Sequence, residues 1–309
     1  MKIIVLDDDP TGSQSVYGCP LLLKWDQESL RIAFESKSDL FFIIANTRAM
    51  LPELAVEITS DICFSILQAA KICNILMRDI IIISRGDSTL RGHGYLEPKI
   101  IDQILGPFNA TIHVPAFFEG NRITIDGVHY LNDTPVHLTE FAKDSIFGYS
   151  TSNLDKWLEE KSSGIISAKN VKRINIQLLE KAEFSQAGMN CLLDNLLALY
   201  NNQPVIIDAE EPLHLNVLSK AIIKLIGRKR FLFRSAASLI KSLAAMKPNP
   251  LNTQDLMNLR LKSESGRDQP GLIIVGSHVP LSNSQLSILL EQNECEGIEL
   301  SLSEISKLI

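Results

Sequence analysis

Short, uninterrupted runs of apolar residues recur along most of this 309-residue chain. A continuous apolar run, rather than an alternation of apolar and polar residues, is typical of a strand buried on both faces of a parallel sheet. The runs that fit this description are residues 3–6 (IIVL), 40–45 (LFFIIA), 80–83 (IIII), 111–115 (TIHVP), 205–208 (VIID) and 231–233 (FLF). Each is predicted to be a β-strand.

Longer segments with helical periodicity lie between these runs. In residues 53–76 the apolar positions recur every three or four residues, which predicts one amphipathic helix with Pro52 at its start. The predicted stripe consists of Leu54, Ile58, Ile62, Ile66, Ala69, Cys73 and Leu76. Residues 153–160 (NLDKWLEE) predict a packed helix with a solvated acidic face. Strands that alternate with helices predict an α/β fold with a mostly parallel sheet and flanking helices.

Polar, glycine-containing loops follow four of the predicted strands, at residues 7–12, 46–48, 84–94 and 115–131. Parallel α/β sheets bind ligands at the carboxyl ends of their strands. We therefore expect these four loops to form one site.

The side chains of these loops suit a small, hydroxylated, anionic ligand. Three adjacent carboxylates, Asp7 to Asp9, repel one another and favour a cation, a hydroxyl to deprotonate, or water nearby. Asp8 or Asp87 can accept a proton from a hydroxyl or hold Mg²⁺. Neutral donors and guanidinium groups complete the predicted set, namely Ser88, Thr89, Arg48, Arg91 and Arg122.

Composition points away from several other classes. The formal net charge is −6 and the basic residues are scattered, so nucleic-acid binding is not expected. No apolar segment reaches about 18 residues, so no membrane span is expected and the cytoplasm is the predicted location. The five cysteines form no CxxC pair and the histidines show no HxxxH or HExxH spacing, so disulfides and a histidine metal site are not expected.

The polar segment 247–270 interrupts this rhythm and predicts a domain boundary. Beyond it, residues 271–277 (GLIIVGS) predict a strand, and the next segment predicts a helix with Ser282 as its N-cap. About forty residues bury too little surface to be stable alone, so a short, incomplete second α/β domain is predicted.

A phosphohydrolase of the haloacid dehalogenase type is an alternative, because Asp7, Asp9 and Thr11 satisfy its DxDxT pattern after the first strand. That mechanism also needs an aspartate pair after a later strand. In GDSTLR, however, Arg91 stands where the second acid belongs. A non-catalytic module that binds a sugar acid is the other alternative.

Eight segments resemble, in order, motifs of the four-carbon acid sugar kinases, also called tetronate kinases. They are DDDPTGSQ, NTRAM, GDSTLRGHG, PAFFEGNRITIDGVHYL, TPVHLTEFAKD, VIIDAEEPLHL, FRSAASL and IIVGSHVPLSNSQ. The resemblance implies ATP-dependent phosphorylation, with Mg²⁺, of a hydroxyl of an erythronate, a threonate or a 3-oxo relative. It further implies a sugar-acid-binding domain at residues 1–246, and a linker and the beginning of a nucleotide-binding domain at residues 247–309.

Carried over by motif, Asp8 and Asp87 are the acids nearest the reacting hydroxyl and the metal. Asp87 is preferred as general base because its neighbours, Gly86 and Ser88, are not carboxylates. Arg48 and Arg91 meet the substrate carboxylate, and Gly276 and Ser277 contact ATP. The remaining substrate-binding positions are Asp7, Thr11, Gly12, Ser88, Gly92, Gly120 and Arg122. The family favours Gly-Arg where Asn121 here separates Gly120 from Arg122.

Chains of this family continue into glycine-rich loops that close around the nucleotide phosphates. Residues after Ser284 do not resemble those loops, so weak or no ATP binding is expected of this chain alone. A homo-oligomer or a separate C-terminal half is the corresponding partner prediction.

Overall fold

The computed structural model describes residues 1–247, 251–277 and 279–301. The chain divides into two compact units, Met1–Pro248 and Asn249–Ile309.

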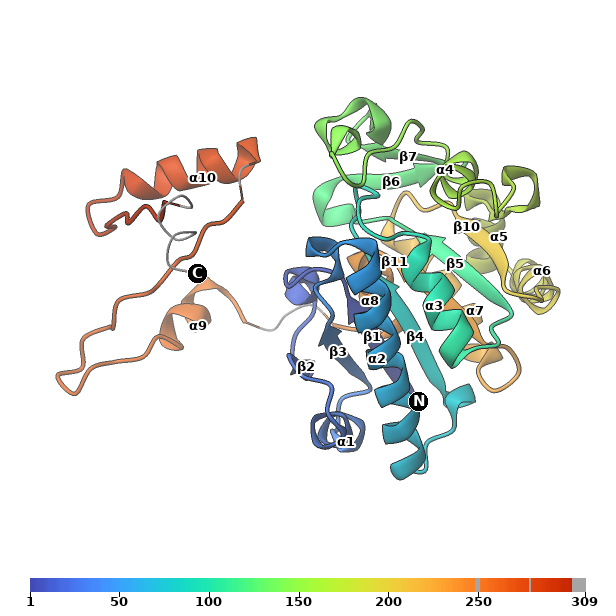
Figure 1. Ribbon diagram of the computed structural model, residues 1–309, viewed down its shortest axis with the longest axis horizontal. Helices are drawn as coiled ribbons and strands as arrows, with labels where there is room; N and C mark the ends of the chain where they lie inside the picture. The colour runs from blue at the N-terminus through green and yellow to red at the C-terminus, as the bar shows by residue number, and fades with distance from the viewer. Residues whose placement is uncertain (248–250, 278, 302–309) are drawn as a thin grey trace. The chain divides into compact units, whose positions relative to one another are not determined.

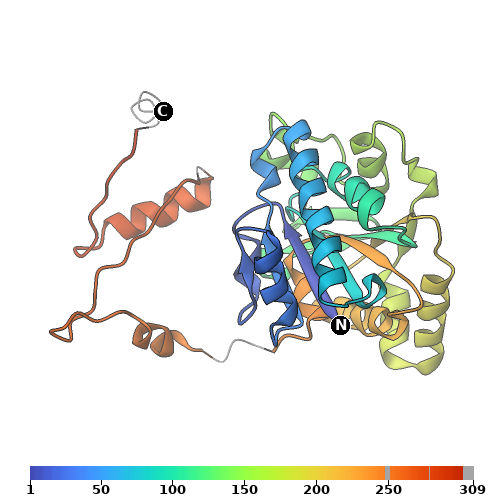
Figure 2. The same ribbon diagram turned by 60° about the horizontal axis from the view of Figure 1, so that its bottom comes forward.

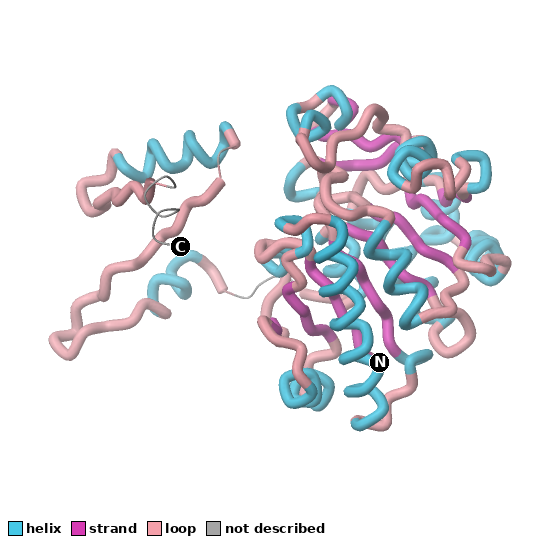
Figure 3. The backbone as a smooth tube through the Cα atoms, viewed as in Figure 1, coloured by secondary structure: helices cyan, strands magenta, loops and turns pink. Residues whose placement is uncertain are grey.

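Within residues 1–247, eight parallel strands form the main sheet, in the order β2-β3-β1-β4-β11-β5-β10-β9 (Figures 1 and 3). The strands are β1 (Lys2–Asp7), β2 (Leu21–Leu22), β3 (Leu40–Ile44), β4 (Ile80–Arg85), β5 (Ala110–Val114), β9 (Lys172–Ile174), β10 (Gln203–Ile207) and β11 (Phe231–Ser235). The six strands predicted within residues 1–247 all form, with ends shifted by at most two residues, whereas β2 and β9 were not predicted. The parallel α/β fold is confirmed.

The sheet is buried on both faces because its strands are apolar at successive positions. In β1, Ile3 and Val5 belong to one hydrophobic core, whereas Ile4 and Leu6 belong to the core on the opposite face. Burial of each such side chain contributes about 1.5–3 kcal/mol to folding.

Helices cover both faces of the sheet (Figures 1 and 2). The face with Ile4 is covered by α1 (Gln27–Glu35), α2 (Pro52–Ile72) and α3 (Leu96–Leu105). The face with Ile3 is covered by α5 (Ile176–Phe184), α6 (Gln186–Leu197), α7 (Pro212–Leu225) and α8 (Ala237–Leu243).

Helix α2 begins at Pro52 as predicted, but its buried stripe differs at both ends from the predicted one. Ala55 and Thr59 are buried with Ile62 and Ile66, whereas Leu54 is exposed. Ala55 lies on the stripe through Ile62 and Ile66 because 55, 59, 62 and 66 are spaced by three or four residues, and this set excludes 54. Leu76 is also exposed because the helix ends at Ile72.

The segment after β5 contains a small antiparallel sheet that was not predicted. Its strands are β6 (Arg122–Ile125), β7 (Val128–Leu131) and β8 (Thr134–Pro135). The β6–β7 turn places Asp126 and Gly127 at positive φ, which is the backbone of a type I′ hairpin turn. The Asp-Gly pair between β-branched residues was the sequence signal for it. Helix α4 (Leu154–Lys161) follows and is packed as predicted.

The unit Asn249–Ile309 contains α9 (Thr253–Asn258) and α10 (Pro280–Leu290). The predicted strand at 271–277 is wrong: these residues form no strand, because no described segment pairs with them. The predicted N-cap Ser282 is also wrong. Helix α10 starts three residues earlier because Pro280, with its fixed φ, occupies the first helical position after the N-cap Val279.

Candidate functional site

The ends of β1, β3 and β4 are joined by backbone hydrogen bonds that continue past the strands. The amides of Ala45 and Asn46 donate to the carbonyl oxygen of Asp7 at 2.9 and 3.2 Å, and the amide of Arg48 donates to that of Asp8 at 3.0 Å. On the other side, the Asp8 amide donates to the carbonyl oxygen of Arg85 at 3.3 Å. Three loops distant in sequence therefore meet at one edge of the sheet.

Asp8 lies at the centre of this edge, only 1% exposed, and is paired with three guanidinium groups. Arg48 Nη2 lies 2.6 Å and Arg85 Nη1 3.5 Å from its Oδ1, while Arg234 Nη2 lies 3.4 Å from its Oδ2. A buried carboxylate needs such partners because its desolvation is costly. Gly92 allows the approach, since a Cβ there would lie 2.8 Å from Asp8 Oδ2.

Asp87 is the second acid of the site and is held ionised. Its carboxylate pairs with Arg91 Nε at 2.7 Å and accepts a hydrogen bond from the Thr89 hydroxyl. Burial by itself raises the pKa of Asp87, but Arg48, Arg91 and the Thr89 bond together lower it to about 2. Burial likewise lowers the pKa of Arg48, and the carboxylates of Asp8, Asp87 and Asp9 raise it well above its usual range. Arg48 thus lies in the field of both Asp8 and Asp87.

Asp7 differs from its two neighbours, although all three follow the same strand. Its side chain is fully buried, and its Oδ2 has no hydrogen-bond partner among the described residues. Burial raises its pKa to about 7, against the lowering effect of Arg85, whose Nη1 lies 3.3 Å from Oδ1. Gly12 lies so close that a Cβ there would be 2.0 Å from Asp7 Oδ2. Asp7 is therefore half protonated near neutral pH.

Asp9 lies at the rim of the cluster, with 24% of its side chain exposed. Its Oδ2 is 3.0 Å from Arg48 Nη1, and its Oδ1 accepts hydrogen bonds from the amide and hydroxyl of Thr11. Burial raises its pKa, but the Thr11 bonds and Arg48 lower it overall. Asp7 thus has a pKa of about 7, Asp8 is enclosed by arginines, and Asp9 is partly exposed.

Three charged residues of the cluster were missed by the sequence analysis, namely Arg85, Arg234 and Glu97. Arg234 pairs with Glu97 and donates to Ser84 Oγ at 2.7 Å, and Thr47 donates to Glu97. Burial raises the pKa of Glu97, which Arg234 lowers. The signal was present in the sequence: apolar runs end in Arg85 and Arg234, just as β1 ends in Asp7.

Arg122 completes the set of guanidinium groups, and it makes no ion pair with any described residue. Its guanidinium lies 5.6 Å from the Phe117 ring centre, and its Nε is buried without a hydrogen-bond partner. Burial lowers the pKa of Arg122, the Asp87 carboxylate raises it and the Arg91 guanidinium lowers it further. Arg122 therefore interacts electrostatically with both Asp87 and Arg91. Gly120 touches Arg122, since a Cβ at Gly120 would be 1.9 Å from Nη1. Asn121 holds the intervening turn at φ 54°, a conformation that asparagine tolerates.

The loop that carries Asp87 and Ser88 is fixed by the residues after β5. Tyr149 donates its hydroxyl to the carbonyl oxygen of Thr89 at 2.7 Å. His129 Nε2 lies 2.8 Å from the carbonyl oxygen of Ser88, and its Nδ1 lies 2.9 Å from Thr124 Oγ1. Burial lowers the pKa of His129 to about 4, so its neutral ring donates through Nε2 and accepts through Nδ1. The small sheet and Tyr149 thus position the loop through hydrogen bonds from neutral side chains.

Of the predicted site residues, Gly276 and Ser277 belong to the unit Asn249–Ile309 and are exposed. Ser282 Oγ donates to Ser277 Oγ at 2.9 Å. The other predicted positions all lie in the unit Met1–Pro248.

The carboxylates at the sheet edge do not fit a protein-held Mg²⁺. In residues 1–247, 251–277 and 279–301, no group of three His, Cys, Asp or Glu side chains is placed to hold a metal ion. Asp8, Asp9 and Asp87 are each already paired with guanidinium groups. Over the same residues, no helix is both long and apolar enough to cross a membrane.

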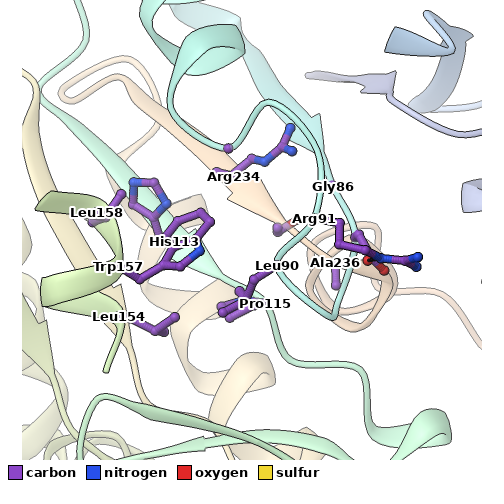
Figure 4. A pocket seen from close by; sticks show the side chains of 13 residues that line it. Gly86, Leu90, Arg91, His113, Pro115, Leu154, Trp157, Leu158, Arg234 and Ala236 are labelled. Carbon is purple, nitrogen blue, oxygen red and sulfur yellow. Dashed lines mark hydrogen bonds and ion pairs between the residues drawn. The ribbon is translucent and has the colours of Figure 1, made fainter. Parts of the chain in front are cut away.

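A small pocket of about 20 Å³ adjoins Asp87 and Arg91 (Figure 4). Its other lining residues include His113 on β5, Trp157 on α4 and Arg234 on β11. A second, wider recess of about 520 Å³ lies between the loop after β5 and helices α7 and α8. The ion pair there, between Lys241 and Glu119, is largely exposed and therefore contributes little energy.

A parallel sheet covered by helices on both faces defines a class of α/β proteins that bind their ligands at the carboxyl edge of the sheet. The model of the sugar-binding N-terminal domain family matches residues 3–243. The chain belongs to this family, the sugar-binding domain of the four-carbon acid sugar kinases.

Several known proteins share this fold or sequence. A D-erythronate kinase of Heliobacterium modesticaldum is 25% identical over 151 residues, which are 46% of this chain and 32% of the relative. A domain of unknown function from Bordetella bronchiseptica, solved with bound citrate as a domain-swapped dimer, aligns with a TM-score of 0.58 and 19% identity over 79% of this chain and 56% of its own. A Haemophilus influenzae protein aligns with a TM-score of 0.55 and 17% identity, over 78% and 55% of the two chains. The chain thus spans about a third of the kinase and about half of each solved relative.

Proposed function

We propose that residues 1–248 bind a four-carbon sugar acid at the Asp8–Arg48–Asp87 cluster and present one of its hydroxyls for phosphorylation by ATP. The observation that carries the proposal is the position of Arg48. It is paired with Asp8 at 2.6 Å and also lies in the field of Asp87, so acids from two different loops share one guanidinium group.

The substrate carboxylate is assigned to Arg122 together with Arg91. Arg48 is already paired with the carboxyl groups of Asp8 and Asp9, whereas Arg122 makes no ion pair among the described residues. An unpaired, half-buried guanidinium near a second arginine gains most from an incoming carboxylate. The citrate reported for the Bordetella domain is also a hydroxylated carboxylate, which supports a ligand of this class.

Asp87 is assigned to the reacting hydroxyl. Its side chain is 11% exposed, compared with 1% for Asp8, so it is the more accessible of the two acids. With a pKa of about 2 it is ionised and accepts a hydrogen bond from the hydroxyl, which orients that oxygen. A weak base suffices because phosphoryl transfer depends mainly on positioning and charge stabilisation. Asp8 acts through Arg48, whose guanidinium it holds in place.

ATP, carried with Mg²⁺, supplies the phosphoryl group, as the D-erythronate kinase relative implies. Gly276 and Ser277 are the positions assigned to it by motif. Both positions are exposed, and the nearby side chains of Leu272 and Ile274 are 85% and 84% exposed. Weak ATP affinity of this chain is therefore part of the proposal, and titration calorimetry that yields a micromolar Kd would refute it.

The exposed apolar residues 272–275 favour an assembly with a second chain, either another copy or a separate C-terminal half. Analytical ultracentrifugation tests this part of the proposal. A monomer throughout the micromolar range would exclude the homo-oligomer.

The main test measures binding of D-erythronate and L-threonate by calorimetry, and ADP release when ATP and Mg²⁺ are added. Asp87→Asn is expected to lower turnover at least about 100-fold, and Asp133→Asn, an exposed acid outside the cluster, is the matched control. Full activity of Asp87→Asn would end the assignment. Binding without ADP release would favour the non-catalytic module.

The phosphohydrolase alternative is tested by hydrolysis of a generic phosphomonoester with Mg²⁺. That mechanism needs Asp7 as an accessible, ionised nucleophile, whereas Asp7 is fully buried with a pKa of about 7. Turnover that Asp7→Asn abolishes would favour the phosphohydrolase over the kinase.

A further inference from the structure

The pocket beside Asp87 has polar groups that the proposed reaction does not use. His113 and Trp157 line it from one side, and Gly86, Arg91 and Ala236 lie across from them (Figure 4). Arg234 also lines the pocket and pairs with Asp8. The pocket is therefore continuous with the charged cluster rather than a separate cavity.

Trp157 contributes an unsatisfied donor. Its side chain is 4% exposed, and its Nε1 is buried without a hydrogen-bond partner among the described residues. Buried indole N–H groups usually donate a hydrogen bond. A buried donor without an acceptor costs about 1–3 kcal/mol of folding free energy. The ring packs against the backbone of Gly94, where a Cβ would be 2.4 Å from Cη2. No side chain of the described residues therefore fills the place of the missing acceptor.

His113 contributes a second polar group to the lining of the pocket. It is 5% exposed. Burial and the nearby Arg234 lower its pKa to about 3, so the ring is neutral and offers one donor and one acceptor nitrogen.

The volume of the pocket limits what it can hold. About 20 Å³ exceeds the roughly 10–15 Å³ that one water needs, but it is too small for a phosphate or a further carbon unit. Part of its wall is apolar and consists of Leu90, Pro115, Leu154 and Leu158. A single neutral oxygen with two hydrogen bonds fits this space.

Given the proposed function, we infer that this pocket takes one secondary oxygen of the sugar acid, a hydroxyl or oxo group that is not phosphorylated. Trp157 Nε1 donates to that oxygen, and the neutral His113 ring is its second partner. Trp157 is then a specificity-determining residue, because its hydrogen bond forms only when the sugar acid carries an oxygen at that carbon.

The test is a cycle of two changes, one in the protein and one in the ligand. Calorimetry gives the Kd of D-erythronate, 3,4-dihydroxybutanoate and 2,4-dihydroxybutanoate for the wild type and for Trp157→Phe. One of the two deoxy acids is expected to bind the wild type about 10-fold more weakly than erythronate. Trp157→Phe is expected to raise the Kd of erythronate by a similar factor and to leave the Kd of that deoxy acid unchanged.

Trp25→Phe is the matched control, because Trp25 Nε1 is bonded to Asp61 at 2.6 Å and lies outside the pocket. The chain has two tryptophans, so in this variant the fluorescence reports Trp157 alone. Its emission is expected to change on saturation with erythronate and not with the sensitive deoxy acid, which keeps the inference testable if Trp157→Phe does not fold.

The inference is overturned if Trp157→Phe raises the Kd of all three acids equally or of none. It is also overturned if the emission of Trp157 changes equally with all three acids. Failure of the wild type to bind any of the acids would instead reject the proposed function.

Discussion

Arg48 Nη2 lies 2.6 Å from Asp8 Oδ1, although 40 positions separate the two residues in the sequence. The pair forms because β1 and β3 are neighbours in the sheet and the Arg48 amide is bonded to the Asp8 carbonyl. Arg85 and Arg234 approach the same carboxylate from β4 and β11. One acid thereby links four strand ends.

Asp8→Asn is expected to destabilise the protein by about 3–5 kcal/mol, because it leaves buried guanidinium groups without their counter-ion. Urea unfolding followed by circular dichroism measures this loss. Asp133→Asn, which changes an exposed acid, is expected to stay within about 0.5 kcal/mol of the wild type. Equal unfolding midpoints for Asp8→Asn and wild type would show that the arginines do not depend on Asp8.

Asp7→Asn is expected to change the pH dependence of stability. Asp7 has a pKa of about 7 when folded and an ordinary value of 3.8, so its folded form binds the proton more tightly. The wild type is therefore stabilised by this group below about pH 3.8 and loses that stabilisation as the pH rises to about 7. Asn does not ionise, so at pH 8 the variant is expected to be more stable by roughly 2–4 kcal/mol.

The control for this experiment is Asp9→Asn, because the pKa of Asp9 is lowered and the sign reverses. Asp9 stabilises the fold above its ordinary pKa, and this contribution is lost as the pH falls through its lowered value. Asp9→Asn is therefore expected to be less stable than the wild type at pH 8. If Asp7→Asn gave the same pH profile as the wild type, the buried carboxyl would not titrate near pH 7.

Gly92→Ala is expected to impair ligand binding beyond its effect on the backbone. Gly92 has a φ of 94°, and a Cβ there would lie 2.8 Å from Asp8 Oδ2. Gly164 has a similar φ of 81° with nothing within 4 Å, so Gly164→Ala imposes comparable strain without the clash. We expect erythronate affinity to fall about 10-fold or more in Gly92→Ala and to be unchanged in Gly164→Ala. Equal affinities in calorimetry would contradict the placement of Asp8 at the ligand site.

Arg122→Met is expected to separate binding from stability. The guanidinium of Arg122 is half-buried without an ion pair among the described residues, so its removal is expected to leave the free energy of unfolding unchanged or higher. The same change is expected to raise the Kd for erythronate at least about 10-fold, since a carboxylate partner is lost. Arg228→Met, at an exposed position, is the control. Unaltered binding by Arg122→Met would reassign the carboxylate to Arg91.

The amino-acid sequence by itself determined six of the eight strands of the main sheet, their parallel arrangement and the loops that meet at the sheet edge. Continuous apolar runs specify strands with two buried faces, and the chain order places polar loops at their carboxyl ends. Asp8, Arg48 and Asp87 were identified in this way. The resemblance in eight ordered motifs gave the family, which the comparison over residues 3–243 confirmed.

Only the tertiary structure decided how these groups divide their tasks. Asp7, Asp8 and Asp9 are chemically identical and adjacent in sequence, yet their surroundings differ. Burial raises the pKa of Asp7 to about 7, whereas arginines from β4, β11 and the turn after β3 enclose Asp8. Thr11 and Arg48 lower the pKa of Asp9. A role for the Trp157 Nε1–H group could likewise not be predicted from the sequence of its helix. The residues that surround this group come from β5, β11 and the loop after β4. Periodicity records which face of an element is apolar, whereas desolvation and charge pairing depend on distances between segments that the sequence keeps far apart.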